Sequence, residues 1–215
     1  GESPNKVLLQ ALGFAAEADN GVLVPTTGAM LLFGKNPSVF IPQCYVKLTN
    51  QDTVHHISGN IFTLVQKTCD LIRELFQDPL YPYDAIEEAL GNALVHRDYL
   101  DTSRGVHVDI KDNCVEISNP GALLAGNKSV KYTNEKNPAR RNAWLYERIL
   151  IMDQGKHFIN MGNGISRMKD AFTQKAKVQF INLGSRNLFK VILPRQIPHL
   201  NKTEADNSQT SNNIE

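Results

Sequence analysis

The pattern of apolar and polar positions is strongest between Asp84 and Tyr99, which reads DAIEEALGNALVHRDY. On a helix of about 3.6 residues per turn its apolar residues fall on one side, which predicts a helix packed against a core. These apolar residues are Ile86, Ala89, Leu90, Ala93 and Leu94. Glu88, Asn92 and His96 recur at every fourth position, so they form a polar stripe along the border of that apolar face.

A second helical pattern runs from Asn60, the expected N-cap, to Phe76. Residues 106–110 and 115–117 alternate between apolar and polar side chains around a polar turn, which predicts an antiparallel hairpin with one buried face. Further strands are expected over residues 43–48, 53–57, 179–183 and 188–193. Helices following one another beside such strands predict an α/β (α+β) fold, a two-layer sandwich of a mixed, mostly antiparallel sheet with helices on one face.

The remaining segments carry shorter patterns. A short helix is expected over residues 6–16, a strand over 22–24, a helix over 29–33 after a Pro25-Thr26-Thr27 cap, a helix capped by Asn142 up to about Met152, and a helix after Gly164. We expect residues 1–42 to be a junction following an N-terminal domain outside this sequence and residues 43–194 to be the principal domain. Residues 195–215 have too little apolar surface to order themselves, so a disordered tail is expected.

Composition narrows the function classes. With 41% hydrophobic and 21% charged residues, the chain has the composition of a soluble globular protein. Its net charge of +1 provides no general basic field, which disfavours direct DNA binding by this segment. The three cysteines are widely spaced and form no zinc motif, so reduced, mostly buried thiols are expected. No signal peptide and no membrane-spanning run are seen, which indicates a cytoplasmic location without membrane contact.

The polar stripe is the first candidate for chemistry. A carboxylate one turn from a carboxamide, on a helix packed into a core, is costly unless a polar group lies against it. Glu88 can take a proton from water, and the Asn92 carbonyl can ligate a hard cation such as Mg²⁺. The alternative, which this stretch leaves open, is an amphipathic surface helix whose Glu88 and Asn92 are solvated.

Two glycine turns are the second candidate. Asn119-Pro120-Gly121 follows a predicted strand, and Gly162-Asn163-Gly164 precedes a predicted helix. Bare backbone N–H groups at a helix start can hold a phosphate, although most glycine turns before helices are only turns. The order of the elements makes these turns stronger candidates for phosphate binding. It is a Glu/Asn helix, a strand, a glycine turn, the long polar segment 124–141, and a second glycine turn before a helix.

Four segments of the chain carry a family resemblance. EEALGNALVHRDY, EISNPGAL, NPARRNAWL and MGNGISRM resemble the histidine-kinase-like ATPase domain of transcriptional regulators that are often labelled RecG-like. That domain is a divergent branch of the GHKL (Bergerat) ATP-binding folds shared by gyrase B, histidine kinases and MutL. The regulators carry an amino-terminal divergent-AlbA (Schlafen-like) domain, and PTTGAMLLFGKNP resembles the junction after it. The resemblance implies that residues 43–194 form a GHKL-like ATP-binding domain.

The resemblance also implies roles for individual residues. Glu88 would polarise the attacking water, and Asn92 would ligate Mg²⁺. Asn119 would accept from the adenine amino group, with Gly121 beneath the base. Gly162, Asn163 and Gly164 would cradle the phosphates of ATP, and Lys or Arg residues of segment 124–141 would close over them.

His96 begins the HRDY sequence and has two interpretations. It is either a nucleotide contact at the end of the polar stripe or part of a helix C-terminus. In the second interpretation, which we favour, Asp98 pairs with Arg97 or Arg104. Trp144 and the Tyr81/Tyr83 pair are expected to be packing aromatics.

Two departures from the family pattern separate two hypotheses. Asn119 stands where the family has Asp, which weakens the hydrogen bond to adenine. The second glycine turn, Gly162-Asn163-Gly164, also has fewer glycines than the family pattern. The first hypothesis is an ATP-binding regulatory domain of a transcriptional regulator, with at most slow Mg²⁺-dependent hydrolysis. Its partner is a nucleotide, and DNA is contacted only through a domain outside this sequence. The alternative is a degenerate GHKL-like scaffold, a homodimer or partner-binding module without nucleotide.

Overall fold

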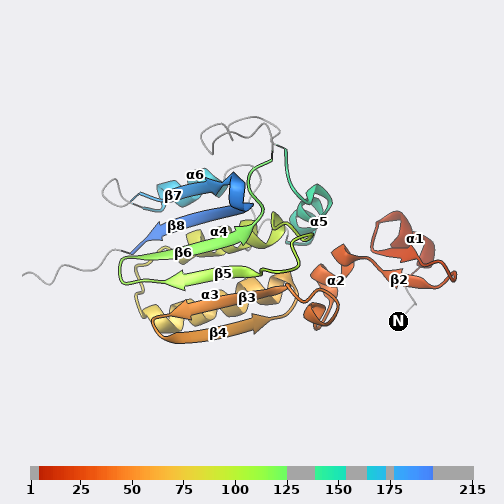
Figure 1. The fold of residues 1–215 in the computed structure, drawn as a ribbon, viewed down its shortest axis with the longest axis horizontal. Helices are drawn as coiled ribbons and strands as arrows, with labels where there is room; N and C mark the ends of the chain where they lie inside the picture. The colour runs from red at the N-terminus through yellow and green to blue at the C-terminus, as the bar shows by residue number, and fades with distance from the viewer. Residues whose placement is uncertain (1–4, 125–138, 154–163, 173–176, 196–215) are drawn as a thin grey trace, which may run out of the picture.

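A six-stranded sheet forms the centre of the molecule. In this computed structural model of the 215-residue chain, residues 5–124, 139–153, 164–172 and 177–195 are described (Figure 1). The strands lie in the order β4-β3-β5-β6-β8-β7. They are β3 (Tyr45–Asn50), β4 (Thr53–Ser58), β5 (Val106–Ile110), β6 (Cys114–Pro120), β7 (Gln179–Leu183) and β8 (Leu188–Pro194), with η3 (Gly184–Arg186) between the last two. The pairing of β3 with β5 is parallel and the other four are antiparallel, which confirms the mixed, mostly antiparallel sheet.

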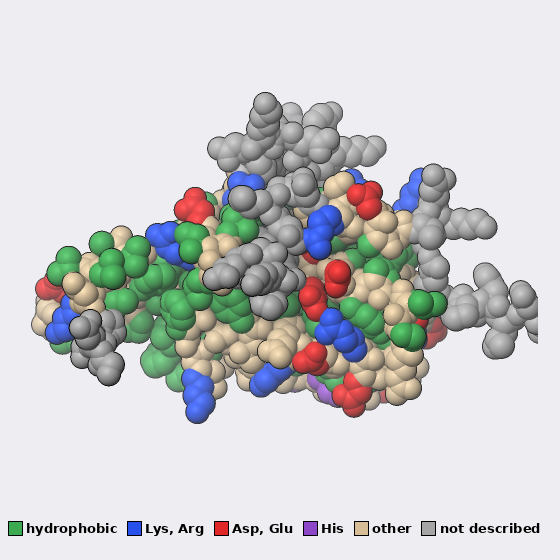
Figure 2. Space-filling model, turned by 180° about the vertical axis from the view of Figure 1, so that it is seen from behind, with side chains coloured by type: hydrophobic (Ala, Val, Ile, Leu, Met, Phe, Trp, Pro, Cys, Tyr) green, Lys and Arg blue, Asp and Glu red, His purple; other side chains and the backbone are tan. Residues whose placement is uncertain are grey.

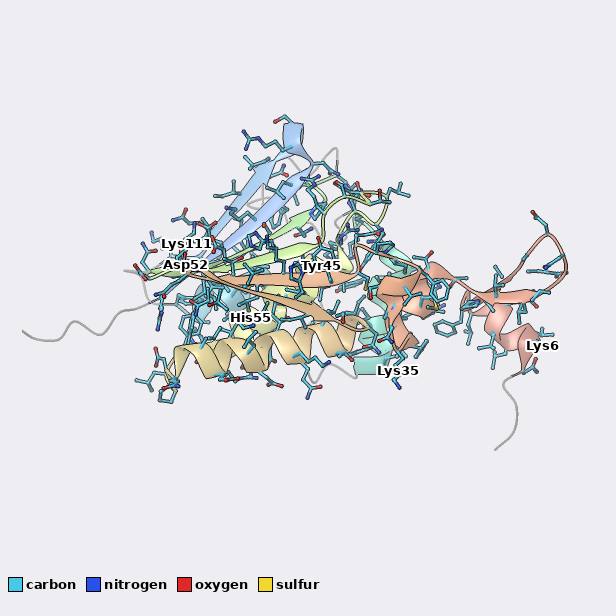
Figure 3. All side chains as sticks on the ribbon, turned by 60° about the horizontal axis from the view of Figure 1, so that its bottom comes forward. Lys6, Lys35, Tyr45, Asp52, His55 and Lys111 are labelled. Atoms are coloured by element: carbon cyan, nitrogen blue, oxygen red, sulfur yellow. The ribbon has the colours of Figure 1, made fainter. Side chains whose placement is uncertain are left out.

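Helices cover one face of this sheet, which confirms the two-layer architecture. These are α3 (Ile61–Phe76), α4 (Tyr83–Val95) and α6 (Gly164–Asp170), which lie behind the strands in Figure 1 and, for α3, below them in Figure 3. The side chain of Asn60 accepts from the backbone N–H of Thr63 at 3.0 Å and so caps α3 as expected. Because both α3 and α4 place apolar stripes against the sheet, a single hydrophobic core lies between the two layers.

The strand pattern decides which side chains meet the helices. Along β5, Val106, Val108 and Ile110 are buried while the residues between them are partly exposed. Along β6, Val115, Ile117 and Asn119 are the buried set, and β6 continues through Pro120 by pairing with Leu188 of β8. Asn119 and Pro120, which the sequence placed in a glycine turn after the strand, therefore belong to β6, and the positive φ of the bend comes at Gly121. Asn119 faces the helix layer because it shares a strand face with Val115 and Ile117.

The N-terminal segment forms a small lobe beside the sheet. It consists of α1 (Lys6–Ala11), β1 (Ala15–Glu17) and β2 (Leu23–Pro25), and it leads through α2 (Thr27–Phe33) and η1 (Pro37–Val39) into the body (Figure 1). The helix expected over residues 6–16 is wrong beyond Ala11. Gly13 adopts a φ of 75°, which ends the helical path. Phe14 then packs against Trp144 at 5.4 Å between ring centroids.

Helix α5 (Ala143–Asp153) holds this lobe against the body through Trp144. The indole Nε1 donates to the carbonyl of Leu12 at 3.2 Å. Apolar side chains remain exposed on the lobe and on the α2–η1 connection, where Figure 2 shows them gathered. They include Val7, Leu8, Phe33, Val39 and Phe40.

The aromatic and cysteine predictions agree with the structure. Tyr81 is buried and packs edge-on against Phe76 at 5.1 Å, with Tyr83 beside it. Cys44 and Cys69 are buried free thiols, and burial raises the pKa of Cys44 to about 11. Within the described ranges, no helix has both the length and the apolar character needed to cross a bilayer. The expected tail beyond residue 195 lies outside the described residues.

Candidate functional site

The carboxylate of Glu88 lies at the junction of two helices. Its residue is 3% exposed, so the polar stripe of α4 is not a solvated face at this position. The Asn92 amide Nδ2 donates to Glu88 Oε1 at 2.9 Å, as the one-turn spacing predicts. Nη1 of Arg167, from α6, lies 3.6 Å from Glu88 Oε2. A buried carboxylate thus accepts a hydrogen bond from a residue of α4 and faces a cation from α6.

The start of α6 lies directly against this carboxylate. A Cβ atom added at Gly164 would come within 1.9 Å of Glu88 Oε1, so only glycine leaves the carboxylate in its present position. The structure therefore brings together three residues that the sequence singled out: Glu88, Asn92 and Gly164. Gly162 and Asn163 lie outside the described residues, as does most of the polar segment 124–141.

The amide of Asn92 is oriented by its neighbour. Because the Glu88 carboxylate accepts hydrogen bonds, it requires the NH₂ group of Asn92, and the carbonyl Oδ1 points elsewhere. Asn92 is partly exposed at this point of α4. No cluster of three or more His, Cys, Asp or Glu side chains suited to a metal occurs in the described part of the chain. A cation at Asn92 would take its other ligands from phosphate and water, as Mg²⁺ commonly does.

The Asn119–Gly121 turn lies at the other end of α4. Asn119 is 3% exposed, and its Nδ2 donates to the carbonyl of Pro120 at 3.1 Å. Gly121 has a φ of 127°, and a Cβ atom there would lie 2.9 Å from the carbonyl oxygen of His96. Since Glu88 and His96 are eight residues apart, the two glycine bends contact α4 at points about 12 Å apart along its axis.

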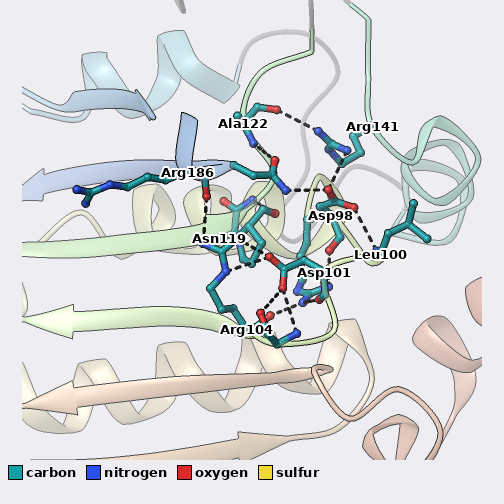
Figure 4. Close-up of polar contacts among 12 residues, drawn as sticks. Asp98, Leu100, Asp101, Arg104, Asn119, Ala122, Arg141 and Arg186 are labelled. Atoms are coloured by element: carbon teal, nitrogen blue, oxygen red, sulfur yellow. Dashed lines mark hydrogen bonds and ion pairs between the residues drawn. The ribbon is translucent and has the colours of Figure 1, made fainter. Parts of the chain in front are cut away.

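The HRDY sequence builds the corner that receives this turn (Figure 4). Helix α4 ends at Val95, and Arg97 is 1% exposed. Its guanidinium donates to the carbonyl of Asp98 at 2.7 Å and also to the carbonyls of Asp101 and Arg104. These bonds hold residues 98–104 in a closed loop, and the Asp98 N–H in turn donates to Pro120 O at 2.7 Å.

The expected partners of Asp98 are wrong. Its Oδ2 accepts from Asn187 Nδ2 at 2.9 Å and lies 3.4 Å from Nη1 of Arg141 (Figure 4). Arg97 is occupied by backbone carbonyls, and Arg104 pairs with Asp101. Sequence reasoning missed Asn187 and gave Arg141 only as one of several cations of a loop. Asn187 is 89 residues from Asp98, so no local periodicity connects them.

Asn142 directly precedes α5, where the sequence predicted a cap, and its carbonyl accepts from the Tyr146 N–H at 3.0 Å, while its side chain also contacts the end of α4. Its Nδ2 donates to the carbonyls of Val95 at 2.8 Å and Arg97 at 2.7 Å. The side chain therefore satisfies the C-terminal carbonyls of α4, while α5 starts at the next residue, Ala143.

His96 lies inside this corner. Its Nδ1 is 3.0 Å from the carbonyl oxygen of Arg141, and its ring stacks on Tyr146 at 5.8 Å. Burial lowers the pKa of His96, and the charges of Arg140 and Arg141 lower it further. The geometry agrees with the helix-terminus interpretation, and a nucleotide contact by His96 stays a prediction.

The depressed pKa of His96 sets a direction for acid stability. The unfolded chain takes up a proton near the ordinary value of 6.5 while the folded chain does not, so the free energy of unfolding falls as pH drops below that value. We expect His96→Gln to flatten the fall in melting temperature between about pH 7 and about pH 5, the range in which histidine titrates. Asp98 and Asp101, whose pKa values are also lowered, act only at more acidic pH. If the melting temperatures of the variant and the parent protein fall equally over that pH range, the expectation is contradicted.

A family model matches part of the chain. Residues 103–193 match the family model HATPase_c_4, described as "Putative ATP-dependent DNA helicase recG C-terminal". The match is to an ATPase-like domain, and it includes Asn119, Gly121 and Gly164 but not Glu88 or Asn92. It covers less than half of the chain. No curated protein matches the chain.

A solved structure is similar in fold over most of the chain. It is the DIP2311 protein from Corynebacterium diphtheriae, with a TM-score of 0.62 and 18% sequence identity. The alignment covers 93% of this chain and 41% of that chain, so this sequence spans well under half the length of its structural neighbour. At this identity the likeness shows the fold alone.

Proposed function

We propose that this chain is an ATP-binding regulatory domain that binds its nucleotide together with Mg²⁺. The observation that carries the proposal is the meeting of Glu88, Asn92 and Gly164 at the junction of α4 and α6. A carboxylate buried there, beside a partly exposed amide and against a backbone where a Cβ would displace it, is explained by a polar ligand that uses these groups. The match of residues 103–193 to an ATPase-like family model supports the same assignment.

Each residue of the site that the structure describes has a role in this proposal. Asn92 offers its Oδ1 to Mg²⁺ without reorienting, because its NH₂ group already bonds Glu88. The backbone at Gly164 lies where the phosphates would pass, and the Asn119–Gly121 turn is the proposed adenine end. Mg²⁺ would supply charge neutralisation of the phosphates. Asn119 accepts from the adenine amino group less strongly than the aspartate of the family pattern would.

ATP hydrolysis is a more specific claim than nucleotide binding and forms the second part of the proposal. Glu88 is the residue placed to take a proton from a water molecule that attacks the terminal phosphate. Both of its oxygens are contacted, one by Asn92 and the other by Arg167, so a water must share them. We therefore propose slow turnover at most, with nucleotide binding as the principal activity.

The regulatory role extends the same proposal. The described similarity is to a RecG C-terminal domain, and the sequence resembles ATPase domains of RecG-like regulators. With a net charge of +1 this segment lacks the basic field that duplex DNA requires. We propose that nucleotide state is sensed here and that DNA is contacted by another domain.

A melting experiment tests nucleotide binding. ATP with Mg²⁺ at millimolar concentration is expected to raise the melting temperature by several degrees, because a ligand that binds only the folded state stabilises it. Asn92→Ala should abolish this rise, since it removes the Mg²⁺ ligand and leaves the helix intact. Asn36→Ala is the matched control, because Asn36 is exposed and makes no capping hydrogen bond. A flat melting temperature in the parent protein would overturn the proposal.

A second candidate function is favoured by exposed apolar side chains on the connection between the N-terminal lobe and the sheet. Phe40 and Val39 are 74% and 70% exposed, and a scaffold that forms a homodimer or binds a partner protein would cover such residues. This scaffold needs no nucleotide, so the same melting experiment separates the two functions.

A further inference from the structure

The ion pair between α6 and α4 joins a buried group to an exposed one. The side chain of Glu88 is 5% exposed and that of Arg167 is 45% exposed, with 3.6 Å between Oε2 and Nη1. This separation is longer than a hydrogen bond, so the pair is a loose electrostatic contact. Because Arg167 keeps much of its hydration, giving up this contact requires little free energy from Arg167 itself.

Three other described basic residues, from α6, from α5 and from the segment before α5, contact other groups. Lys169, on the same helix, lies 5.7 Å from the centre of the Phe180 ring, and Arg148 lies 5.4 Å from that of Trp144. Arg141 pairs with Asp98. Arg167, by contrast, lies at Glu88.

A bound nucleotide would compete for the same guanidinium. If Glu88 acts on the water that attacks the terminal phosphate, that phosphate lies within a few ångströms of both Glu88 and Arg167. A guanidinium binds phosphate through two parallel N–H bonds, which is a stronger interaction than its single long contact with Glu88.

We propose that Arg167 exchanges partners, from the Glu88 carboxylate in the empty site to the terminal phosphates of a bound nucleoside di- or triphosphate. The proposal rests on the nucleotide-binding function proposed above and makes it specific. Glu88 then opposes binding by holding Arg167, and Arg167 distinguishes ATP and ADP from AMP. The exchange breaks no covalent bond.

A double-mutant cycle tests the exchange. The dissociation constants of ATP, ADP and AMP with Mg²⁺ are measured by calorimetry for the parent protein, Arg167→Met, Glu88→Gln and the double variant. Arg167→Met should weaken ATP and ADP by about tenfold or more, as expected for the loss of a charge-assisted hydrogen bond, and leave AMP within about twofold. Glu88→Gln should tighten ATP through release of Arg167, and this gain should shrink in the Arg167→Met background.

Controls separate the exchange from general electrostatics. Lys169→Met removes a positive charge from the same helix, so its ATP affinity should stay within about threefold of the parent value. Equal weakening of ATP and AMP by Arg167→Met would overturn the exchange. An equal gain in ATP affinity from Glu88→Gln in the parent and in the Arg167→Met variant would also overturn the exchange, because repulsion between Glu88 and the phosphates acts with or without Arg167. In either case the nucleotide-binding function stands. A parent protein that binds none of the three nucleotides would remove both proposals.

Discussion

Arg97→Met is expected to lower the free energy of unfolding by about 3–6 kcal/mol, because it leaves three partly buried carbonyls without their donor. The guanidinium bonds the carbonyls of Asp98, Asp101 and Arg104 and lies 5.1 Å from the centre of the Tyr99 ring. Methionine fills the space of the side chain but donates nothing. The free energy of unfolding of Arg97→Lys should lie between those of the parent protein and Arg97→Met, since one ammonium cannot reproduce the paired N–H donors of a guanidinium. Urea unfolding followed by circular dichroism measures the change.

Arg73→Met is the matched control for this large effect. Arg73 pairs with Asp70 and Glu87 on the surface, where its side chain is 41% exposed, so its replacement should cost within about 1 kcal/mol. If Arg97→Met costs no more than Arg73→Met, the loop after α4 does not depend on the buried arginine. The role assigned to Arg97 would then be wrong.

Gly121→Ala is expected to be the second most damaging change, at roughly 2–5 kcal/mol. The φ of 127° at Gly121 is strained for any residue with a Cβ. The added atom would also lie 2.9 Å from His96 O and 3.0 Å from Asp98 N. Both are backbone atoms of the corner held by Arg97, so they cannot rotate away as a side chain would. The expected fall in melting temperature is about 5–15 °C for a chain of this size.

Gly184→Ala provides the comparison for Gly121. No heavy atom lies within 4 Å of a Cβ placed at Gly184, and its φ is not positive. This change should be neutral or raise stability slightly, because alanine restricts the unfolded chain. Equal melting temperatures for the two variants would mean that the turn after β6 relaxes freely and that the corner around α4 is not rigid.

Most of the elements follow from local pattern. The helical spacing from Asn60 to Phe76 and the alternation in β5 and β6 predicted elements that the structure contains, because burial of one face imposes these periods on the sequence. The error over residues 6–16 came from Gly13 and Phe14, whose conformation depends on Trp144, more than a hundred residues later. A short apolar run is compatible with either a helix or a strand until its packing partner is known.

The contacts of the candidate site also fall into those that follow from the sequence and those that only the tertiary structure shows. The contact of Asn92 with Glu88 follows from a spacing of four residues on one helix, and the sequence alone determined it. Arg167 could not be assigned to Glu88 from the sequence, since its helix meets α4 only in the tertiary structure.

The sequence by itself thus determined the helices and strands with a regular buried face, and the pair of polar residues one turn apart on α4. Those features depend on neighbours within a few positions, where geometry is nearly constant. Only the tertiary structure decided that Asp98 is bound by Asn187 and Arg141, that Asn142 caps α4, and that Gly164 lies against Glu88. These contacts join segments tens of residues apart, and a polar side chain takes whichever partner the packed core brings within hydrogen-bond distance.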